Sequence, residues 1–372
     1  MESFESCNWT QFGYKFTQVF EPAVLYELAL LEGVRFSALV RLEDRRTEAL
    51  ASLGAMFDQA SELSVIELVN VSSALISISR FEPAQSLLRI LSERRTTSRE
   101  DFEIGWLEFL ISNRCGRGVN SPAAFEKMGR AVTTREIPIS RVLDSCTQAV
   151  VWYIKRRELP PAEYERWLKL GTSLSQSSDH IEPGSLSSWY RGIAMVPAAN
   201  GDSVATRRSM ELAREAADRC TGSEAGAAET NMIKTYYESA MKEYVYVQRD
   251  MDAAKEAGRS LIALDPAWSV SYGELAEVYL RSKQVEKAAQ LYEKAVTVGP
   301  PYVAHHLLKA ATCRDQCGDL SRAMAHFEKL AGLAPRSRQV MTAGLALAHR
   351  LSHPSSTVFK RGLQEIETHV AD

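Results

Sequence analysis

The stretch that decides the fold is residues 272–300, which read YGELAEVYLRSKQVEKAAQLYEKAVTVGP. From Tyr272 to Tyr279, large apolar side chains return at intervals of three and four residues, which places them on one face of a helix. A polar turn follows, and a second amphipathic run carries Ala288 on its apolar face. Pro300 ends that run, because proline lacks an N–H and disfavours helix in the preceding residue. The stretch therefore predicts two helices joined by a short turn.

The landmarks of this stretch recur along the chain at a nearly constant interval. Pro266 precedes Pro300 by 34 residues, and Pro335 follows it by 35. Alanines at the close-packed position keep the same spacing at Ala254, Ala288 and Ala323. A fixed period of this length is the sequence signature of a repeat array, in which each unit covers the apolar face of its neighbour.

Residues 235–335 resemble the tetratricopeptide repeat, a helix–turn–helix of about 34 residues with the pattern W-x2-L-G-x2-Y, then A-x3-F, then P. The middle unit matches it at Tyr272, Leu275, Ala276, Tyr279, Ala288, Tyr292 and Pro300. The following unit offers Leu307, Ala310, Ala311, Arg314, Ala323, Phe327 and Pro335. The preceding unit is weaker, because Gly258 stands where an aromatic residue is usual. The resemblance implies an all-α fold, an α-solenoid of antiparallel helix pairs with an irregular helical N-terminal half.

We expect four parts along the chain. They are an N-terminal helical cap or bundle (1–60), degenerate helical repeats (61–234), the tetratricopeptide array (235–338) and C-terminal capping helices (339–372). The capping helices are expected because the last apolar face of an array has no successor to cover it. No stretch shows the two-residue alternation typical of a half-buried strand.

Local signals in the N-terminal half also favour helices. Ser64-x-x-Glu67 and Ser98-x-x-Asp101 resemble capping boxes. Faint helix pairs start at Leu68 and at Trp106, whereas the serine-rich stretch 171–184 and residues 197–203 are the best candidates for loops or hinges.

The first twenty residues are rich in aromatic side chains, namely Phe4, Trp9, Phe12, Tyr14, Phe16 and Phe20. Two interpretations stay open for them. They cover the first exposed face of the array, or they form a docking segment, since aromatic residues are enriched at interface hot spots.

In the tetratricopeptide family, the first helices of successive units line a concave groove. The resemblance therefore implies a partner-binding set on this chain at Tyr236, Glu243, Tyr246, Glu277, Arg281, His305, Leu308 and Asp315. One subgroup of the family binds acidic chaperone tails through a clamp of lysine, asparagine and arginine. Gly273 and Leu308 stand where the clamp lysine would be, and Glu277 and Thr312 stand where its asparagine would be. We therefore expect no such clamp.

Acidic residues within this set indicate the chemistry of the partner. Glu243, Glu277 and Asp315 would repel a carboxylate at close range. The expected partner is a protein or peptide segment that is neutral to basic and partly apolar.

Composition excludes several other classes of function. The 44 Lys+Arg residues against 47 Asp+Glu give a net charge of −3, so no basic excess favours nucleic-acid binding. No run of about 20 apolar residues predicts a membrane span, and the acidic start of the chain is unlike a secretion signal. We expect a cytoplasmic protein whose six cysteines are reduced thiols.

No motif in the sequence predicts catalysis, a cofactor or a metal. Glycine-rich phosphate loops, zinc-protease helices and nucleophile elbows are all missing from it. Cys313-x3-Cys317 with nearby histidines invites a zinc interpretation, but structural cysteines in a repeat helix explain the segment better.

The leading hypothesis is a non-catalytic scaffold or adaptor that holds a peptide or partner helix in the concave groove. A peptide-sensing regulatory protein is the main alternative, because a helical N-terminal half joined to repeats fits that layout. An accessory subunit or divergent enzyme of a biosynthetic pathway stays open as a third interpretation.

Overall fold

The structure is a computed structural model that describes residues 58–77, 81–114, 121–156, 160–177, 180–219, 227–266, 268–299 and 302–371. The expected N-terminal cap, apart from residues 58–60, and the aromatic segment from Phe4 to Phe20 lie outside these ranges. Within them all regular secondary structure is helical, which confirms the predicted all-α class. The described residues fall into two compact units, the N-terminal unit (58–249) and the C-terminal unit (250–371).

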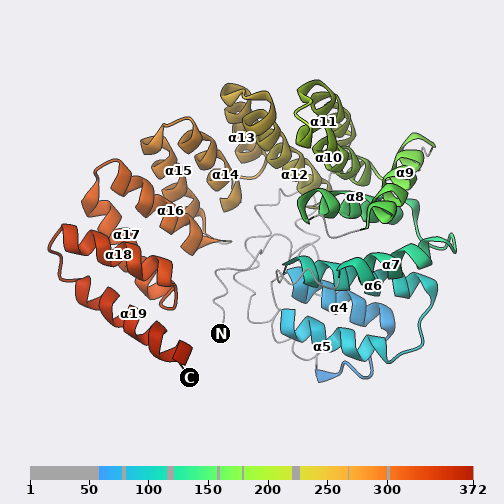
Figure 1. Ribbon diagram of the computed structural model, residues 1–372, viewed down its shortest axis with the longest axis horizontal. Coiled ribbons are helices and arrows are strands. Elements are labelled where there is room, and N and C mark those ends of the chain that lie inside the picture. The colour runs from blue at the N-terminus through green and yellow to red at the C-terminus, as the bar shows by residue number, and fades with distance from the viewer. Residues whose placement is uncertain are drawn as a thin grey trace. The chain divides into compact units, whose positions relative to one another are not determined.

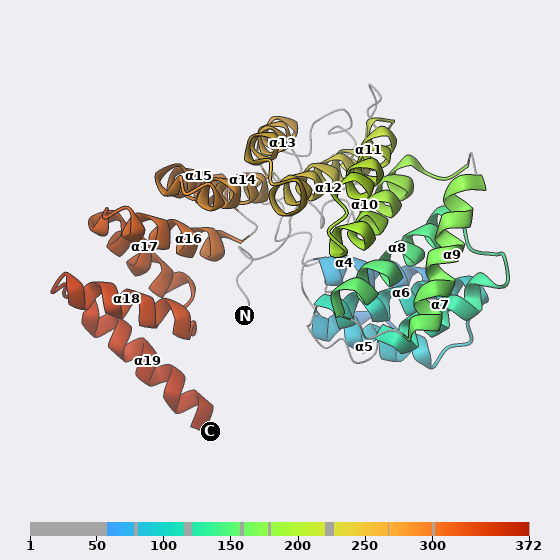
Figure 2. The same cartoon turned by 45° about the horizontal axis from the view of Figure 1, so that its top comes forward.

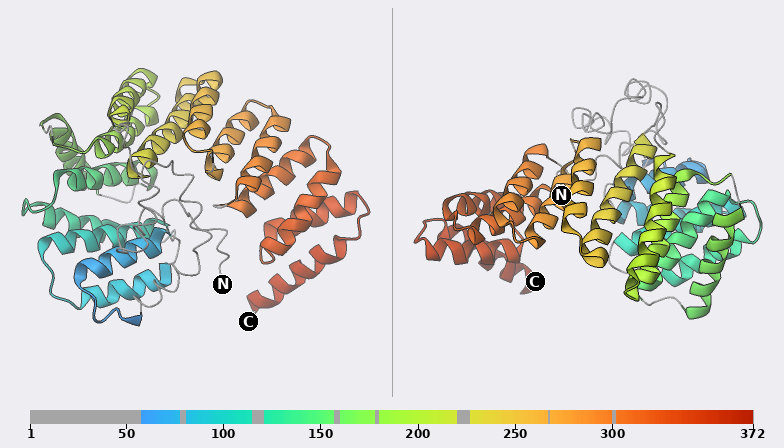
Figure 3. Two further views of the ribbon diagram at one scale, coloured as in Figure 1. Left: turned by 180° about the vertical axis from the view of Figure 1, so that it is seen from behind. Right: turned by 90° about the horizontal axis from the view of Figure 1, so that it is seen from above.

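The N-terminal unit is built from consecutive helix pairs. In chain order its helices are α4 (Val65–Ser77), α5 (Phe81–Ser92), α6 (Ser98–Arg114), α7 (Ser121–Val132), α8 (Ile139–Arg156), α9 (Pro161–Ser177), α10 (Pro183–Ala199), α11 (Ser203–Asp218) and α12 (Ala227–Glu243), and α12 continues into a π-helical segment, η4 (Tyr244–Gln248). The pairs α4 with α5, α6 with α7, α8 with α9 and α10 with α11 lie side by side in Figures 1 and 3. The two faint pairs expected from the sequence are therefore confirmed as helix pairs.

The C-terminal unit continues the same arrangement. Its helices are α13 (Met251–Leu264), α14 (Ser269–Arg281), α15 (Val285–Val298), α16 (Val303–Gln316), α17 (Leu320–Leu333), α18 (Arg338–Arg350) and α19 (Ser356–Ala371). Each helix packs against the next along the chain, as Figures 1 and 2 show for α14 to α19. The two helices predicted over 272–300 are α14 and α15, and their contact confirms the predicted pair.

Small side chains allow the close approach of α14 and α15. Ala276 on α14 and Ala288 on α15 are both fully buried in one apolar cluster. Tyr292 fills the space beside them and is 2% exposed. Because alanine adds no bulk beyond its Cβ, the backbones can come close while the larger tyrosine supplies most of the buried apolar area.

Helix starts follow from local sequence signals. Asp250 caps α13, and its carboxylate accepts hydrogen bonds from the N–H groups of Asp252 and Ala253. The predicted capping box at Ser64 is confirmed by a bond of 2.7 Å from Ser64 N to Glu67 Oε2. The second predicted box was placed one residue too late.

At this second site, the box is formed by Thr97 and Glu100. Thr97 N donates to Glu100 Oε2 at 2.7 Å, and Glu100 N donates to Thr97 Oγ1 at 3.3 Å. Asp101 instead accepts a bond from the Thr96 hydroxyl at 2.5 Å, so its carboxylate is engaged outside the box. The sequence offered two overlapping candidates, and the longer glutamate reaches back to the capping residue better than aspartate does.

The serine-rich stretch 171–184 is not a loop over most of its length, so this prediction was wrong. Helix α9 runs through Ser177, and α10 begins at Pro183. Gly171 lies inside α9, where an added Cβ would come within 2.4 Å of the Trp189 ring of α10. The glycine serves close helix packing rather than a turn, which a composition argument does not distinguish.

Candidate functional site

The candidate site is the exposed side of α14, α16 and α18, which we call the first-helix face of the C-terminal unit. Each of these helices is the first of its pair. Of the predicted groove residues, Glu277 and Arg281 lie on α14, and His305, Leu308 and Asp315 lie on α16. These five residues are at least partly accessible to solvent.

Glu277 is the centre of a polar cluster on this face. Its Oε2 atom accepts a hydrogen bond from the Tyr292 hydroxyl at 3.2 Å and lies 3.7 Å from Lys309 Nζ of α16. Its Oε1 atom lies 3.3 Å from Arg281 Nε, one helical turn away. Burial and the neighbouring Glu277 charge raise the pKa of the Tyr292 hydroxyl, so the tyrosine is a neutral donor. The carboxylate of Glu277 is thus compensated by two cations and a hydroxyl.

A second charge pair links α16 to α18. Arg350 Nη1 lies 2.8 Å from Asp315 Oδ1 and donates a second bond to Oδ2 at 3.0 Å. Together with the contact between Glu277 and Lys309, this pair bridges successive first helices. The carboxylates at Glu277 and Asp315, which suggested repulsion of an acidic partner, are therefore already paired within the face.

The same two helices also carry less polar side chains, Leu280, Leu308 and Thr312, which we call the less polar strip. Leu308 is half-buried, and Leu280 on α14 is also half-buried. Thr312 is exposed, although its hydroxyl donates to Leu308 O at 2.9 Å. His305 is exposed as a whole residue, but partial desolvation of its ring and the nearby Lys309 lower its pKa.

His306 lies just beneath this face. It is 4% exposed, and its Nδ1 atom has no hydrogen-bond partner. Burial and the adjacent His305 lower its pKa to about 4, which keeps the ring neutral. A Cβ at Gly273 would come within 2.6 Å of its Nε2 atom. The glycine at this groove position therefore makes room for the ring packed behind it.

The repeat pattern did not predict the role of Arg314. This residue stands at the aromatic position of the repeat pattern, yet its side chain is 2% exposed. Its guanidinium binds Glu293 of α15 in a fork and donates to Glu286 Oε1 at 2.7 Å. His326 of α17 lies 2.9 Å from the same Glu293. This network joins α15, α16 and α17, and the only hint of it in the sequence is an arginine where the repeat pattern has an aromatic residue.

The other predicted groove residues belong to the N-terminal unit, and two of them are buried. Tyr236 and Glu243 are each 5% exposed, whereas Tyr246 is 50% exposed. Glu243 Oε2 accepts a bond from Arg207 Nη1 of α11 at 2.7 Å. Burial raises the pKa of Glu243, although Gln248 and Arg207 oppose the shift. Of the three, Tyr246 alone presents a large accessible side chain.

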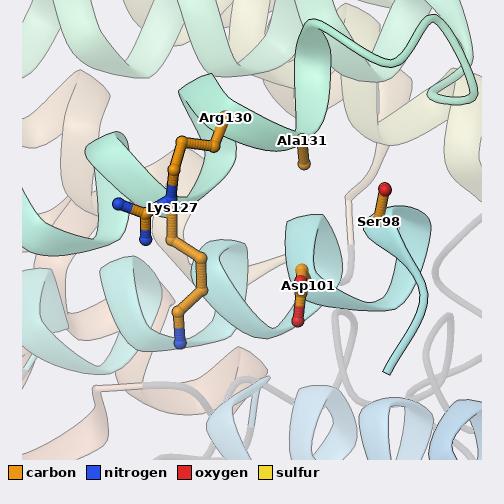
Figure 4. A pocket seen from close by; sticks show the side chains of 5 residues that line it. All are labelled: Ser98, Asp101, Lys127, Arg130 and Ala131. Atoms are coloured by element: carbon orange, nitrogen blue, oxygen red, sulfur yellow. The ribbon is translucent and has the colours of Figure 1, made fainter. Parts of the chain in front are cut away.

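A pocket of about 430 Å³ lies between α6 and α7 in the N-terminal unit. Figure 4 shows its lining residues, which are Ser98, Asp101, Lys127, Arg130 and Ala131. Both cations have carboxylate partners, because Lys127 lies 2.6 Å from Glu108 and Arg130 lies 2.7 Å from Glu126. None of the predicted groove residues lines this pocket, which is polar and already charge-compensated.

The described part of the chain holds no group of three or more histidine, cysteine or acidic side chains placed to bind a metal ion. Cys313 is buried and Cys317 is exposed, and both are free thiols. Burial raises the pKa of Cys313 to about 11, so its thiol is protonated at neutral pH. No helix in the described ranges has both the length and the apolar character needed to cross a membrane.

Comparison with known proteins identifies solved structures with a similar fold. No family model and no curated protein matches the sequence. Among solved structures, the apo form of RapI is similar with a TM-score of 0.51 and 11% identity, over 82% of this chain and 86% of that one. A tetratricopeptide repeat protein from Parabacteroides merdae has a TM-score of 0.42 and 13% identity, over 78% and 99% of the two chains. The likeness to RapI shows that the chain has a helical repeat fold of the tetratricopeptide type.

Another similar structure is the human IFIT1 dimer with m7Gppp-AAAA, with a TM-score of 0.49 and 14% identity, over 99% of this chain and 82% of that one. At such low identities the likeness concerns the tetratricopeptide-type fold and not the ligand. The fold confirms the repeat assignment that rested on 235–335, and it extends helix pairing to the described residues on the N-terminal side.

Proposed function

We propose that this tetratricopeptide-type protein is a non-catalytic scaffold that holds a segment of another protein on the first-helix face of the C-terminal unit. The proposal rests on the accessible, less polar side chains of Leu280, Leu308 and Thr312, which lie on the same helices as the two sets of paired charges. An accessible strip of this kind suits an extended peptide or a partner helix.

The paired charges narrow the chemistry of the proposed partner. Glu277 faces Arg281 and Lys309, and Asp315 faces Arg350, so the acidic and basic groups offset one another. A strongly basic segment would have to compete with these internal cations for the same carboxylates. A neutral, partly apolar segment would not, and it would gain by covering the two leucines. The sequence predicted a partner segment that is neutral to basic, and we therefore favour a neutral one.

The test is site-specific photocrosslinking in the full-length protein in its native cells. A photoreactive side chain at Thr312 lies on the first-helix face, and one at Ala325 lies on the exposed surface of α17 as the matched control. We expect one reproducible protein adduct at Thr312 and none at Ala325. In the Thr312 background, Leu308→Glu should abolish the adduct while the melting temperature changes by only a few degrees.

Equal crosslinking at the two positions would count against the proposed face. An adduct at Thr312 that survives Leu308→Glu would likewise show that the strip is not the binding surface. If adducts formed at Ala325 alone, the scaffold would bind its partner on the second helices.

A further inference from the structure

The end of α12 has an unusual turn. Beyond Glu243 the helix widens into the π-helical segment Tyr244–Gln248, which is the one segment of this type in the described ranges. Arg249 then adopts a left-handed conformation with φ of 59°, and its N–H bonds to Tyr244 O. A π-helical turn amounts to a single-residue insertion into an α-helix, and such turns are frequent at functional sites.

A side-chain hydrogen bond spans this wide turn. Gln248 Nε2 donates to Glu243 Oε1 at 2.8 Å, across five residues. In an α-helix, residues five apart point roughly 140° away from each other, because each residue advances about 100°. In the wider turn they return to the same side. The bond between Glu243 and Gln248 therefore forms only while the turn is wide.

The neighbouring helix anchors this bond. Arg207 of α11 donates from Nη1 to Glu243 Oε2 at 2.7 Å, and its guanidinium lies over the Tyr244 ring at 5.1 Å from the centroid. Gln248 Nε2 also donates to Ser203 O at 2.9 Å. The Glu243 side chain is 3% exposed, so water competes little for these bonds. We call Glu243, Gln248 and Arg207 the latch.

The latch lies where the chain leaves the N-terminal unit. The boundary between the two compact units falls between Arg249 and Asp250, directly after the wide turn. If the turn closed to an α-helical one, the following chain would rotate by roughly the 100° of one residue about the helix axis. The type of turn therefore sets the direction in which α13 begins.

We propose that residues 243–249 are a two-state register switch, held in the wide state by the latch, which sets the exit direction of the chain toward the C-terminal unit. Tyr246 lies on the switch and is 50% exposed, so a molecule that contacts it differently in the two states would shift their populations. The switch is independent of the proposed partner face, since its residues all lie in the N-terminal unit.

The first test is Gln248→Leu in the full-length protein, which removes the spanning bond and keeps a side chain of similar size. Hydrogen exchange of the amides in 244–249 should become at least tenfold faster than in the parent. Small-angle scattering should show changed dimensions. The matched control is Gln290→Leu on α15, where an exposed glutamine bonds Glu286 at 3.1 Å within a regular helix. It should change neither measurement.

The second test deletes Val247, which removes the extra residue. Glu243 and Gln248 are then four positions apart and can keep their hydrogen bond in an α-helical turn. We expect slow exchange at the turn together with scattering unlike that of the parent. The proposal is overturned if Gln248→Leu leaves exchange at 244–249 unchanged, or if the faster exchange spreads equally over α10 and α11. It is also overturned if every folded variant scatters like the parent.

Discussion

Arg314 of α16 is bound by Glu293 of α15 through two parallel hydrogen bonds, 2.8 Å from Nε to Oε1 and 2.6 Å from Nη2 to Oε2. This fork matches the planar guanidinium to the carboxylate and is among the stronger polar contacts in proteins. The preceding repeat has Tyr279 at the equivalent position of the pattern. In this repeat an ion pair therefore joins successive helix pairs at the position where the preceding repeat has an aromatic side chain.

Replacing Arg314 with methionine should destabilise the C-terminal unit by about 2 kcal/mol or more. Methionine fills much of the same space but leaves Glu293 partly buried without its cation, and breaking a buried pair from one side is costly. Denaturant unfolding followed by circular dichroism measures the loss. The control is Arg322→Met, since Arg322 is 63% exposed and lies 3.6 Å from Asp319. Equal stability of the two variants would contradict the assigned role of Arg314.

The same pair predicts a dependence of stability on pH. Hydrogen bonds from Arg314 and His326 lower the pKa of Glu293 to about 2, against 4.5 for a free glutamate. A lowered carboxylate pKa gives stability that is present above pH 4.5 and is lost as the pH falls toward 2. Unfolding free energies of Arg314→Met should therefore fall less steeply over that range than those of the parent. Parallel curves for the two proteins would rule out the pair as the cause.

Ala288→Phe tests the close contact between α14 and α15. The fully buried methyl group leaves no space for a ring, so overpacking should cost roughly 1–3 kcal/mol. Ala346→Phe serves as the control, because Ala346 is exposed on α18 and a ring there points into solvent. If Ala288→Phe melted at the temperature of the parent, the register of the helix pair would be wrong.

The sequence predicted those features that depend on contacts between residues close together in the chain. The pair over 272–300 and the capping box at Ser64 depend on residues within a few positions of one another, and both are confirmed. The ion pair of Arg314 with Glu293 joins residues 21 positions apart, and that of Arg207 with Glu243 joins residues 36 apart. Such contacts depend on how helices pack, which no local pattern records.

The predictions that the structure contradicts have the same cause, namely contacts with residues of other helices. Glu243 fits the groove spacing, but the neighbouring α11 places Arg207 against it, so the side chain is buried. The serine-rich stretch that contains Gly171 has a loop-like composition, but Trp189 of another helix needs the space there. Of the partner-binding set, five residues lie on α14 and α16 of the C-terminal unit and are at least partly accessible, and their binding role is a proposal.

Asp144 of α8 should show the opposite pH dependence to Glu293. Burial raises its pKa to about 6 from 3.8, although Arg141 lies 3.7 Å away. Between these values the folded protein binds a proton that the unfolded chain does not, so stability falls as the pH rises from about 4 to 6. Asp144→Asn cannot ionise. Its stability relative to the parent should therefore grow by about 2 kcal/mol over that range, at about 1.4 kcal/mol per pKa unit.

The control for this measurement is Asp218→Asn on α11, at a side chain that is 62% exposed. Its stability relative to the parent should stay nearly constant from pH 4 to pH 6. A similar slope in both variants would show that general surface charge, and not the burial of Asp144, sets the dependence.

Two glycine-to-alanine changes within helices should act in opposite directions. Alanine favours a helix over glycine by about 1 kcal/mol, so Gly332→Ala on α17, where an added Cβ meets nothing within 4 Å, should stabilise the protein. At Gly171 the Cβ would come within 2.4 Å of the Trp189 ring and 2.9 Å of Cys146 Cβ, so the clash should outweigh the same gain and destabilise by about 1–2 kcal/mol. Thermal unfolding of both variants decides the matter. If Gly171→Ala were also stabilising, α9 would have to lie farther from α10 than the structure places it, and the explanation for this glycine would fail.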